Sequence, residues 1–324
     1  MNTTPSSTLH FTASASTDGL DGRALVLAGA GAAGNAWQLG LIAGLSDAGV
    51  DLTDADLIIG TSAGSTVAAQ MTSGTRPADL YAAIVAETPP TRPTGARPSG
   101  SGARPSGPGP SGGRAPHLSG PAYMAWSDAI IAASEDAADM RRRMGAAALE
   151  RDQSDGADGA RWRTVVAARL PRHEWPRQRI LIPAVDARTG EPVVFDRDSG
   201  VELVDAVAAS TSAMIPYPIG ERRYINGGYR RSSNADLAAG HRRVLVLEPF
   251  GGRSRSPQRW GMDLATQVAE LRAGGSEVET VFPDAGAGDV FNANALDPST
   301  RLPAARGGYA QGRALAAGLT DLWR

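Results

Sequence analysis

Residues 23–50 read RALVLAGAGAAGNAWQLGLIAGLSDAGV, and residues 56–74 read DLIIGTSAGSTVAAQMTSG. Each stretch opens with a short apolar run that ends in glycine, which is typical of a strand buried on both faces. Each then changes to a helical pattern, and in the first of them Trp37, Leu41 and Leu45 recur at the spacing of one helix face. The order strand, helix, strand, helix predicts an α/β fold with a mainly parallel sheet that helices cover on both sides.

Later segments continue this pattern. We expect strands within 179–196 (two, joined by a turn at Thr189 and Gly190), 222–233, 242–250 and 275–283. We expect helices within 121–150, from 201 to a break at Pro216, around 261–273 and near 303–322. No second core can be separated from the first, so residues 23–324 are expected to form one domain.

Two segments differ in composition from the rest of the chain. Residues 1–22 are rich in serine and threonine and lack periodicity, which predicts a disordered leader. Residues 88–120 consist mainly of proline, glycine, serine and arginine, and they contain GARPSG twice, at 95–100 and 102–107. Such a segment buries too little apolar surface to offset the entropy of ordering. We therefore expect a disordered insertion at about 88–120, with a proline-rich docking segment as the alternative.

The composition excludes several classes of function. The 324 residues are 42% hydrophobic and 20% charged, with a formal net charge of −2, which suits a globular chain and argues against a nucleic-acid surface. Cysteine is absent, so disulfides, thiolate zinc sites and cysteine nucleophiles are excluded. The four histidines lie far apart without ligand spacing, so we expect no metal and no cofactor. With no apolar run of membrane length and no signal-peptide pattern, the expected location is cytoplasmic.

The glycine loop at 29–34 allows two interpretations. Its sequence, GAGAAG, matches the dinucleotide fingerprint G-x-G-x-x-G between a strand and a helix. That fingerprint requires an acidic residue at the end of the second strand to bind ribose, whereas this strand ends in Thr61 and Ser62. In the second interpretation the N–H groups of the loop bind an oxyanion beside the second strand, and small residues allow the close approach.

Residues 60–64, GTSAG, form the pattern G-x-S-x-G between the second apolar strand and a helix. This is the context of a nucleophile elbow, a tight turn that exposes a serine above the sheet. The following helix directs its N-terminal N–H groups at that serine and at any oxyanion formed there. Ser62 is therefore predicted to be a nucleophile that forms a covalent acyl-enzyme.

Three blocks of this sequence resemble the patatin-like phospholipase family of serine acyl hydrolases. They are LVLAGAGAAGNAWQLGLIAGL (25–45), GTSAGS (60–65) and YINGGYRRSSNADLAAGHRRVLVLEP (224–249). The resemblance implies a three-layer α/β/α fold, a Ser–Asp dyad and cleavage of the carboxylic esters of acyl lipids. It also implies transient contact with a membrane surface.

The resemblance assigns roles to individual residues. On this basis Ser62 is the nucleophile, and the oxyanion hole is built from Gly29, Ala30, Gly31 and the N–H of Ala63. The aspartate of the family's D-G-G or D-G-A motif falls on Asn226, which is followed by two glycines.

Asn226 leaves three functions open. A carboxylate accepts the proton of serine at neutral pH, whereas an amide does not. The chain is then a hydrolase that uses Ser62 with Asn226, an acyl-binding protein without its base, or an acyltransferase or cyclase that passes the acyl group to an acceptor other than water. His241, Asp186, Asp205 and Asp236 are the other candidate bases, and their sequence contexts favour structural roles. An apolar stretch at 214–218 either lines an acyl groove or packs in the core.

Overall fold

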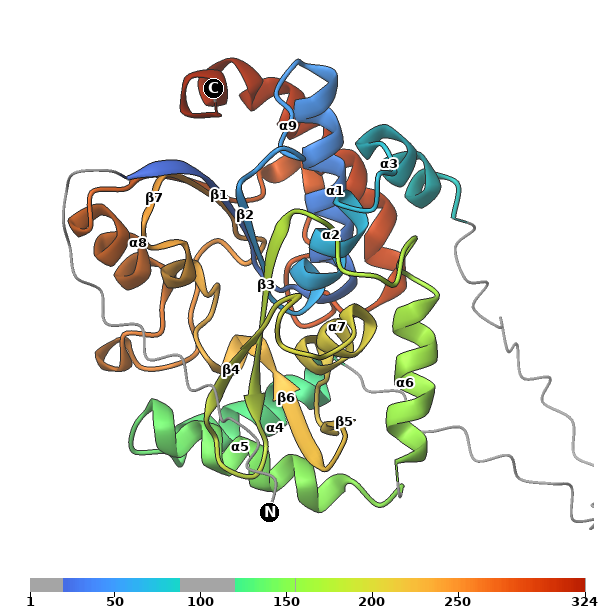
Figure 1. The fold of residues 1–324 in the computed structure, drawn as a ribbon, viewed down its shortest axis with the longest axis vertical. Helices are drawn as coiled ribbons and strands as arrows, with labels where there is room; N and C mark the ends of the chain where they lie inside the picture. Colours follow the sequence, from blue (N-terminus) through green and yellow to red (C-terminus); the bar gives the residue numbers. More distant parts are fainter. Residues whose placement is uncertain (1–19, 88–119, 155, 324) are drawn as a thin grey trace, which may run out of the picture.

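The computed structural model describes residues 20–87, 120–154 and 156–323 of the chain (Figure 1). The expected leader and the expected insertion lie outside these residues, except at their edges. The first strand already begins at Asp21, two residues before the expected start of the domain. Gly120, the last residue of the expected insertion, is buried at the start of a helix.

Within the described residues, eight strands form one sheet. The strands are β1 (Asp21–Leu27), β2 (Leu57–Gly60), β3 (Arg179–Asp186), β4 (Pro192–Phe195), β5 (Tyr217–Ile219), β6 (Arg222–Asn226), β7 (His241–Leu247) and β8 (Glu277–Val281). Their order is β5-β6-β3-β2-β1-β7-β8, and β4 pairs with β3 outside this path. The neighbouring strands β3, β2, β1, β7 and β8 are parallel to one another. Strands β4, β5 and β6 add antiparallel pairs. The sheet is therefore mostly parallel, as the sequence predicted.

Helices cover both faces of the sheet (Figure 1). They are α1 (Gly31–Asp47), α2 (Ala63–Met71), α3 (Pro77–Val85), α4 (Gly120–Ala132), α5 (Ala137–Arg151), α6 (Ala157–Ala167), α7 (Leu203–Thr211), α8 (Leu264–Ala273) and α9 (Arg301–Trp323). Because side chains alternate along a strand, Leu25 and Leu27 of β1 pack in the cluster with α1, α2 and α9. Ala24 and Val26 of the same strand pack in a second cluster with α8. The fold is the predicted three-layer α/β/α arrangement.

Helix α1 is buried on every side instead of on one face. Its residues from Ala33 to Leu45 are all buried, because α2, α3 and α9 all pack against it. Glycines make this packing close: a Cβ on Gly308 or Gly312 of α9 would lie 2.3 Å from a backbone oxygen of α1. Two helix backbones can approach this closely only where side chains are absent at the crossing.

Other boundaries differ from the sequence-based expectation. The expected helix at 121–150 is two helices, α4 and α5, and Asp136 caps the second by accepting a hydrogen bond from the N–H of Asp139 (2.7 Å). Helix α7 ends at Thr211, before the expected break at Pro216. Residues 77–85 and 157–167 form helices, α3 and α6, that the sequence analysis did not anticipate.

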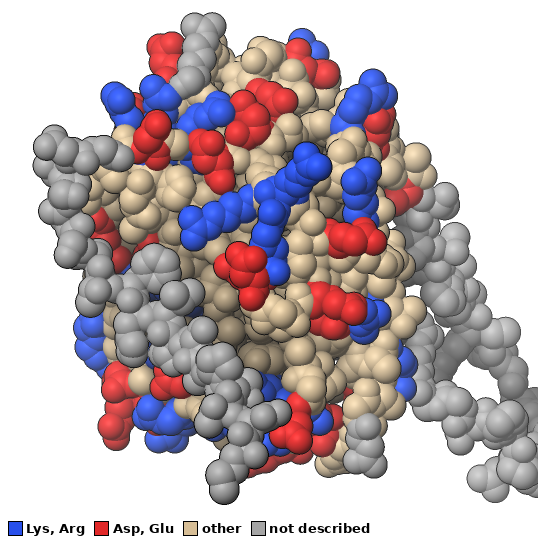
Figure 2. Space-filling view, viewed as in Figure 1, with Lys and Arg blue, Asp and Glu red and all other residues tan. Residues whose placement is uncertain are grey.

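Acidic and basic side chains are interspersed over the face shown in Figure 2, and neither sign forms a continuous surface there. Within the described ranges, no helix combines the length and apolar character needed to cross a membrane.

Candidate functional site

Ser62 lies in the turn between β2 and α2, with backbone angles of φ 52° and ψ −121°. Among the described residues, only Ser62 and Asn234 have a positive φ without being glycine. Such a conformation costs about 1–3 kcal/mol and persists only where the surroundings hold it. A side chain would clash at both flanking glycines. A Cβ on Gly60 would lie 2.7 Å from the oxygen of Gly64, and one on Gly64 would lie 2.0 Å from the oxygen of Leu27. The local sequence therefore folds into the strained turn that G-x-S-x-G predicts.

The glycine loop lies directly beside this turn. A Cβ on Gly29 would lie 2.8 Å from the Cβ of Ser62, so only glycine fits here. Helices α1 and α2 both begin at this point, at Gly31 and Ala63. The N–H groups of Ala30, Gly31 and Ala63 donate to no acceptor among the described residues. Of the four residues expected to form an oxyanion hole, Gly29, Ala30 and Gly31 line a cavity together with Ser62, whereas Ala63 follows Ser62 directly but does not line it.

Asn226, the last residue of β6, also reaches Ser62. Its Nδ2 lies 3.0 Å from Ser62 Oγ, across 164 residues of sequence. Its Oδ1 accepts a hydrogen bond from the N–H of Gly228 (2.9 Å). Because the backbone N–H of Gly228 can only donate, it fixes Oδ1 as the acceptor and leaves Nδ2 to face Ser62. The amide therefore donates to the serine oxygen and has no atom there that could take its proton.

The other candidate bases are held by contacts of their own, as their contexts suggested. His241 begins β7, at the end of the sheet opposite to Ser62, and its ring bonds the carbonyl of Ala238. Asp186 accepts the N–H groups of a turn, Asp205 pairs with Arg163 and Tyr217, and Asp236 pairs with Arg230. Among the described residues, no carboxylate or histidine hydrogen-bonds to Ser62 Oγ.

Ser62 and Asn226 line a cavity of about 520 Å³, a size typical of small-ligand sites. Its wall is mainly apolar and includes Met124, Ile131, Met140, Phe250, Met262 and Phe291. Helices α4 and α5 supply the first three of these residues. Of the apolar stretch at 214–218, no residue lines the cavity, and its Met214 and Tyr217 are buried. Core packing was therefore the correct interpretation for that stretch.

Comparison with known proteins supports the resemblance seen in the sequence. Residues 25–239 match the patatin-like phospholipase family, which is more than half of the 324-residue chain. The chain belongs to the patatin-like phospholipase family. The matched range contains Ser62, Asn226 and the glycine loop, and the family suggests a lipid acyl hydrolase.

Among solved structures, this patatin-like chain is similar to VipD from Legionella pneumophila. The TM-score is 0.42 and the identity 14%, over 92% of this chain and 67% of that chain. A search of curated proteins finds no match. The family assignment therefore rests on the sequence match over 25–239.

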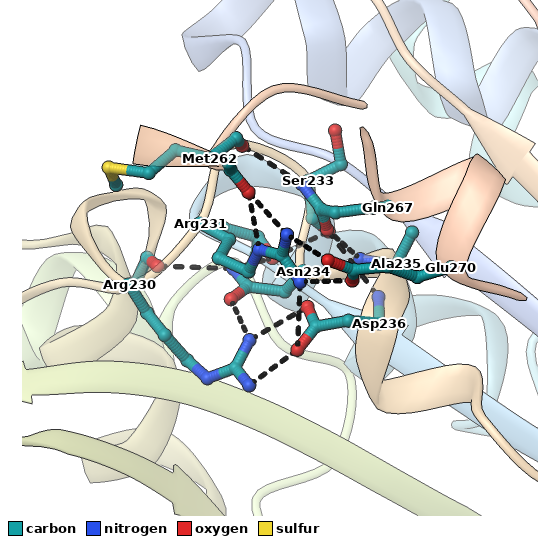
Figure 3. Close-up of polar contacts among 12 residues, drawn as sticks. Arg230, Arg231, Ser233, Asn234, Ala235, Asp236, Met262, Gln267 and Glu270 are labelled. Carbon is teal, nitrogen blue, oxygen red and sulfur yellow. Dashed lines mark hydrogen bonds and ion pairs between the residues drawn. The ribbon is translucent and has the colours of Figure 1, made fainter. Parts of the chain in front are cut away.

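Arg230, Asn234 and Asp236 belong to a polar cluster in the patatin-like domain (Figure 3). Arg230 donates to Asn234 Oδ1 (2.9 Å) and forms two hydrogen bonds with Asp236 (2.9 and 2.7 Å). Asn234 Nδ2 in turn donates to Thr61 Oγ1 (3.0 Å) and to the oxygen of Gly227 (3.1 Å). The side chain of Asn234 thus links Thr61, which precedes Ser62, to Gly227, which follows Asn226.

Sequence analysis did not assign this supporting role to Asn234. Asn234 has φ 57°, and asparagine tolerates this left-handed region better than most residues other than glycine. An asparagine close after the two glycines was therefore a usable signal. Ser210 of α7 was also missed: its Oγ accepts the N–H of Ser62 (3.0 Å). No local pattern marks that contact, because α7 lies far away in the sequence.

Glu248 is a buried carboxyl directly after β7, with 5% of its surface exposed. It contacts Ser233 Oγ and accepts the N–H of Phe250 (3.2 Å). Burial is the largest influence on its pKa and raises it from 4.5 to about 7, against the opposing effect of these two hydrogen bonds. The folded protein thus binds this proton more tightly than the unfolded chain does.

Glu248→Gln is expected to raise the melting temperature at about pH 8 and to change it much less at about pH 5. Because the pKa of Glu248 is higher in the folded state, wild-type stability falls as the pH rises from about 4.5 to about 7. The glutamine side chain of the variant cannot ionise, so the stability of the variant does not fall over this pH range. Thermal unfolding at both pH values measures the effect, with the exposed Glu277→Gln as control. Equal shifts at both pH values would contradict the raised pKa.

Within the described residues, no group of three or more His, Cys, Asp or Glu side chains could hold a metal ion.

Proposed function

We propose that the protein is a serine acyl hydrolase that cleaves carboxylic esters of acyl lipids, with Ser62 as the nucleophile. The observation that carries this proposal is the position of Ser62: it stands in a strained strand–helix turn and opens onto an apolar cavity of about 520 Å³. A turn of this kind is costly and recurs where a serine must be exposed to a substrate. The family match over 25–239 supports the same reaction class.

The reaction has two steps. In the first, Ser62 Oγ attacks the acyl carbonyl, and the N–H groups of Ala30, Gly31 and Ala63 stabilise the oxyanion. The tetrahedral intermediate breaks its bond to the leaving alkoxide, which takes up a proton and departs as an alcohol. In the second, water attacks the acyl-enzyme, releases the carboxylic acid and returns the hydroxyl of Ser62.

The amide of Asn226 determines how fast Ser62 attacks the acyl carbonyl. Its Nδ2 positions Ser62 Oγ at 3.0 Å and stabilises the oxygen as it loses its proton. The proton itself passes to water or to the leaving group, since an amide does not accept it. We therefore propose a slow hydrolase, in which Asn226 is a positioning group and not a base.

An acyl-binding protein without turnover is the second candidate. It is favoured by one observation, that no described carboxylate or imidazole hydrogen-bonds to Ser62 Oγ. In that case the cavity holds an acyl chain and the serine does not react with it. An acyltransferase would share the acyl-enzyme but release it to an alcohol or amine.

Covalent labelling by a fluorophosphonate probe tests these functions. We expect the wild type to be labelled, slowly because no base assists Ser62, and Ser62→Ala to show only background, because the probe reacts with a nucleophilic serine. Ser232→Ala is the matched control: Ser232 lines the same cavity but its hydroxyl donates to the oxygen of Met262 (2.9 Å), so labelling should persist. Labelling of Ser62→Ala would disprove the nucleophile assignment. An unlabelled wild type that binds alkyl ligands would indicate the acyl-binding protein, and products formed only with an added alcohol would indicate transfer.

A further inference from the structure

The charged residues of the cavity all have the same sign. Among the residues that line it, Arg253 and Arg255 are the charged ones, and no aspartate, glutamate or histidine is present. Both belong to the loop between β7 and α8. The cavity that Ser62 lines thus has both apolar and cationic residues in its wall.

The two arginines differ in how their charges are balanced. Arg255 forms an ion pair with Asp128 (2.8 Å), donates to Ser127 Oγ (2.6 Å) and stacks over the ring of Tyr123. Arg253 lies within 4.0 Å of no carboxylate among the described residues. Arg253 therefore carries the uncompensated charge of this cavity.

Backbone oxygens hold the guanidinium of Arg253 in place. Its Nε donates to the oxygen of Phe250 (2.9 Å) and its Nη2 to the oxygen of Phe291 (2.9 Å). Phe250 and Phe291 both line the cavity, so the guanidinium joins two loops of its wall. Of the five N–H groups of an arginine, these contacts occupy two, and the remaining ones are available to a ligand.

We propose that Arg253 is a specificity-determining residue that selects acyl compounds carrying a phosphate. This inference rests on the proposed function, because it takes the apolar wall as the binding site of the acyl chain. A guanidinium that is uncompensated and held in a fixed orientation favours an oxyanion with its charge and its paired hydrogen bonds. The phosphate could belong to a lipid head group or to a soluble acyl carrier such as a coenzyme A thioester, and both present the same chemistry to Arg253.

Calorimetric titration with three probes of equal chain length tests the proposal without turnover. The probes are dodecyl phosphate, dodecanol and dodecyltrimethylammonium, the two ionic probes below their critical micelle concentrations and the alcohol below its solubility limit. We expect the wild type to bind the phosphate at least about tenfold more tightly than the alcohol, and the cation most weakly. Arg253→Gln should lose this preference, while Arg253→Lys should keep the part due to charge and lose the part due to the paired hydrogen bonds of the guanidinium.

Controls separate a charge effect from a structural one. Arg259→Gln removes an arginine of the same loop that does not line the cavity and should leave all three affinities unchanged. The phosphate preference of the wild type should weaken from low to high salt, and that of Arg253→Gln should not. An undiminished phosphate preference in Arg253→Gln would overturn the proposal, since another group would then select the phosphate.

The outcomes distinguish this inference from the proposed function. Equal binding of dodecyl phosphate and dodecanol would overturn the role of Arg253 and leave the acyl cavity intact. Failure of all three probes to bind would overturn both. Titration with a 1-O-alkyl glycerol phosphate and with an S-alkyl coenzyme A then identifies the source of the phosphate, by which of the two binds more tightly.

Discussion

Asn226→Asp is expected to raise the rate of ester hydrolysis by at least about 100-fold, which corresponds to about 2.7 kcal/mol of transition-state stabilisation. The carboxylate has the shape of the amide, so the N–H of Gly228 still orients it and its second oxygen lies where Nδ2 now faces Ser62 Oγ. That oxygen accepts the serine proton, which Nδ2 cannot do. In serine proteases, which keep a histidine base, a comparable Asp→Asn change lowers turnover roughly 10⁴-fold.

The assay compares initial rates on one ester for the wild type and Asn226→Asp. The double variant Ser62→Ala with Asn226→Asp should be inactive, because the new base has no nucleophile to serve. Asn294→Asp, the same change at an exposed position, should match the wild type. Mass spectrometry of the peptide that contains Asn226 must accompany the wild-type rate, since Asn followed by Gly can deamidate and supply the aspartate. An Asp variant no faster than undeamidated wild type would disprove the role of position 226.

Replacing Gly308 and Gly312 together by alanine is expected to destabilise the protein by about 4 kcal/mol, roughly two overpacking penalties of ~2 kcal/mol each. The new methyl groups would lie 2.3 Å from the oxygens of Trp37 and Leu41. Since these are backbone atoms of a helix, neither can move aside alone, and α1 and α9 must separate along their crossing. Chemical denaturation measures the loss as a lower midpoint with an unchanged slope.

Gly318→Ala is the matched control for this pair. Gly318 lies on the same helix, but a Cβ there meets no atom within 4 Å. Alanine is better than glycine in a helix by about 1 kcal/mol, so this variant should be slightly more stable than the wild type. The same chemical change thus has opposite signs at two places on α9. A stabilised Gly308→Ala/Gly312→Ala variant would show that the two helices do not pack as described.

The parts of the site that the sequence predicted are those formed by neighbouring residues. The turn at Ser62 needs only an apolar strand, small residues and a helix in succession, and each is visible in 56–74. The glycine loop at 29–34 is likewise formed by consecutive residues between a strand and a helix. Its place beside Ser62 follows from the parallel pairing of β1 with β2, which the strand–helix–strand order predicts.

Asn226 was located by resemblance and not by any local rule. Its contact with Ser62 requires β6 to pair in antiparallel orientation with β3, and β3 in turn to pair with β2. The sequence also could not predict the direction of the hydrogen bond between Asn226 and Ser62, because the N–H of Gly228 decides which amide atom faces the serine. Ser210 and Asn234 depend on contacts of the same long range.

The sequence by itself determined the fold class, the strained turn and the glycine loop, because these follow from hydrophobic periodicity and turn chemistry over a few consecutive residues. Only the tertiary structure decided that α1 is buried on all sides, that Asn226 donates to Ser62, and that Arg253 is the uncompensated charge in the cavity. The physical reason is common to all three. Burial, hydrogen-bond direction and charge compensation depend on which distant segments come into contact, and each segment's own sequence is compatible with several such partners.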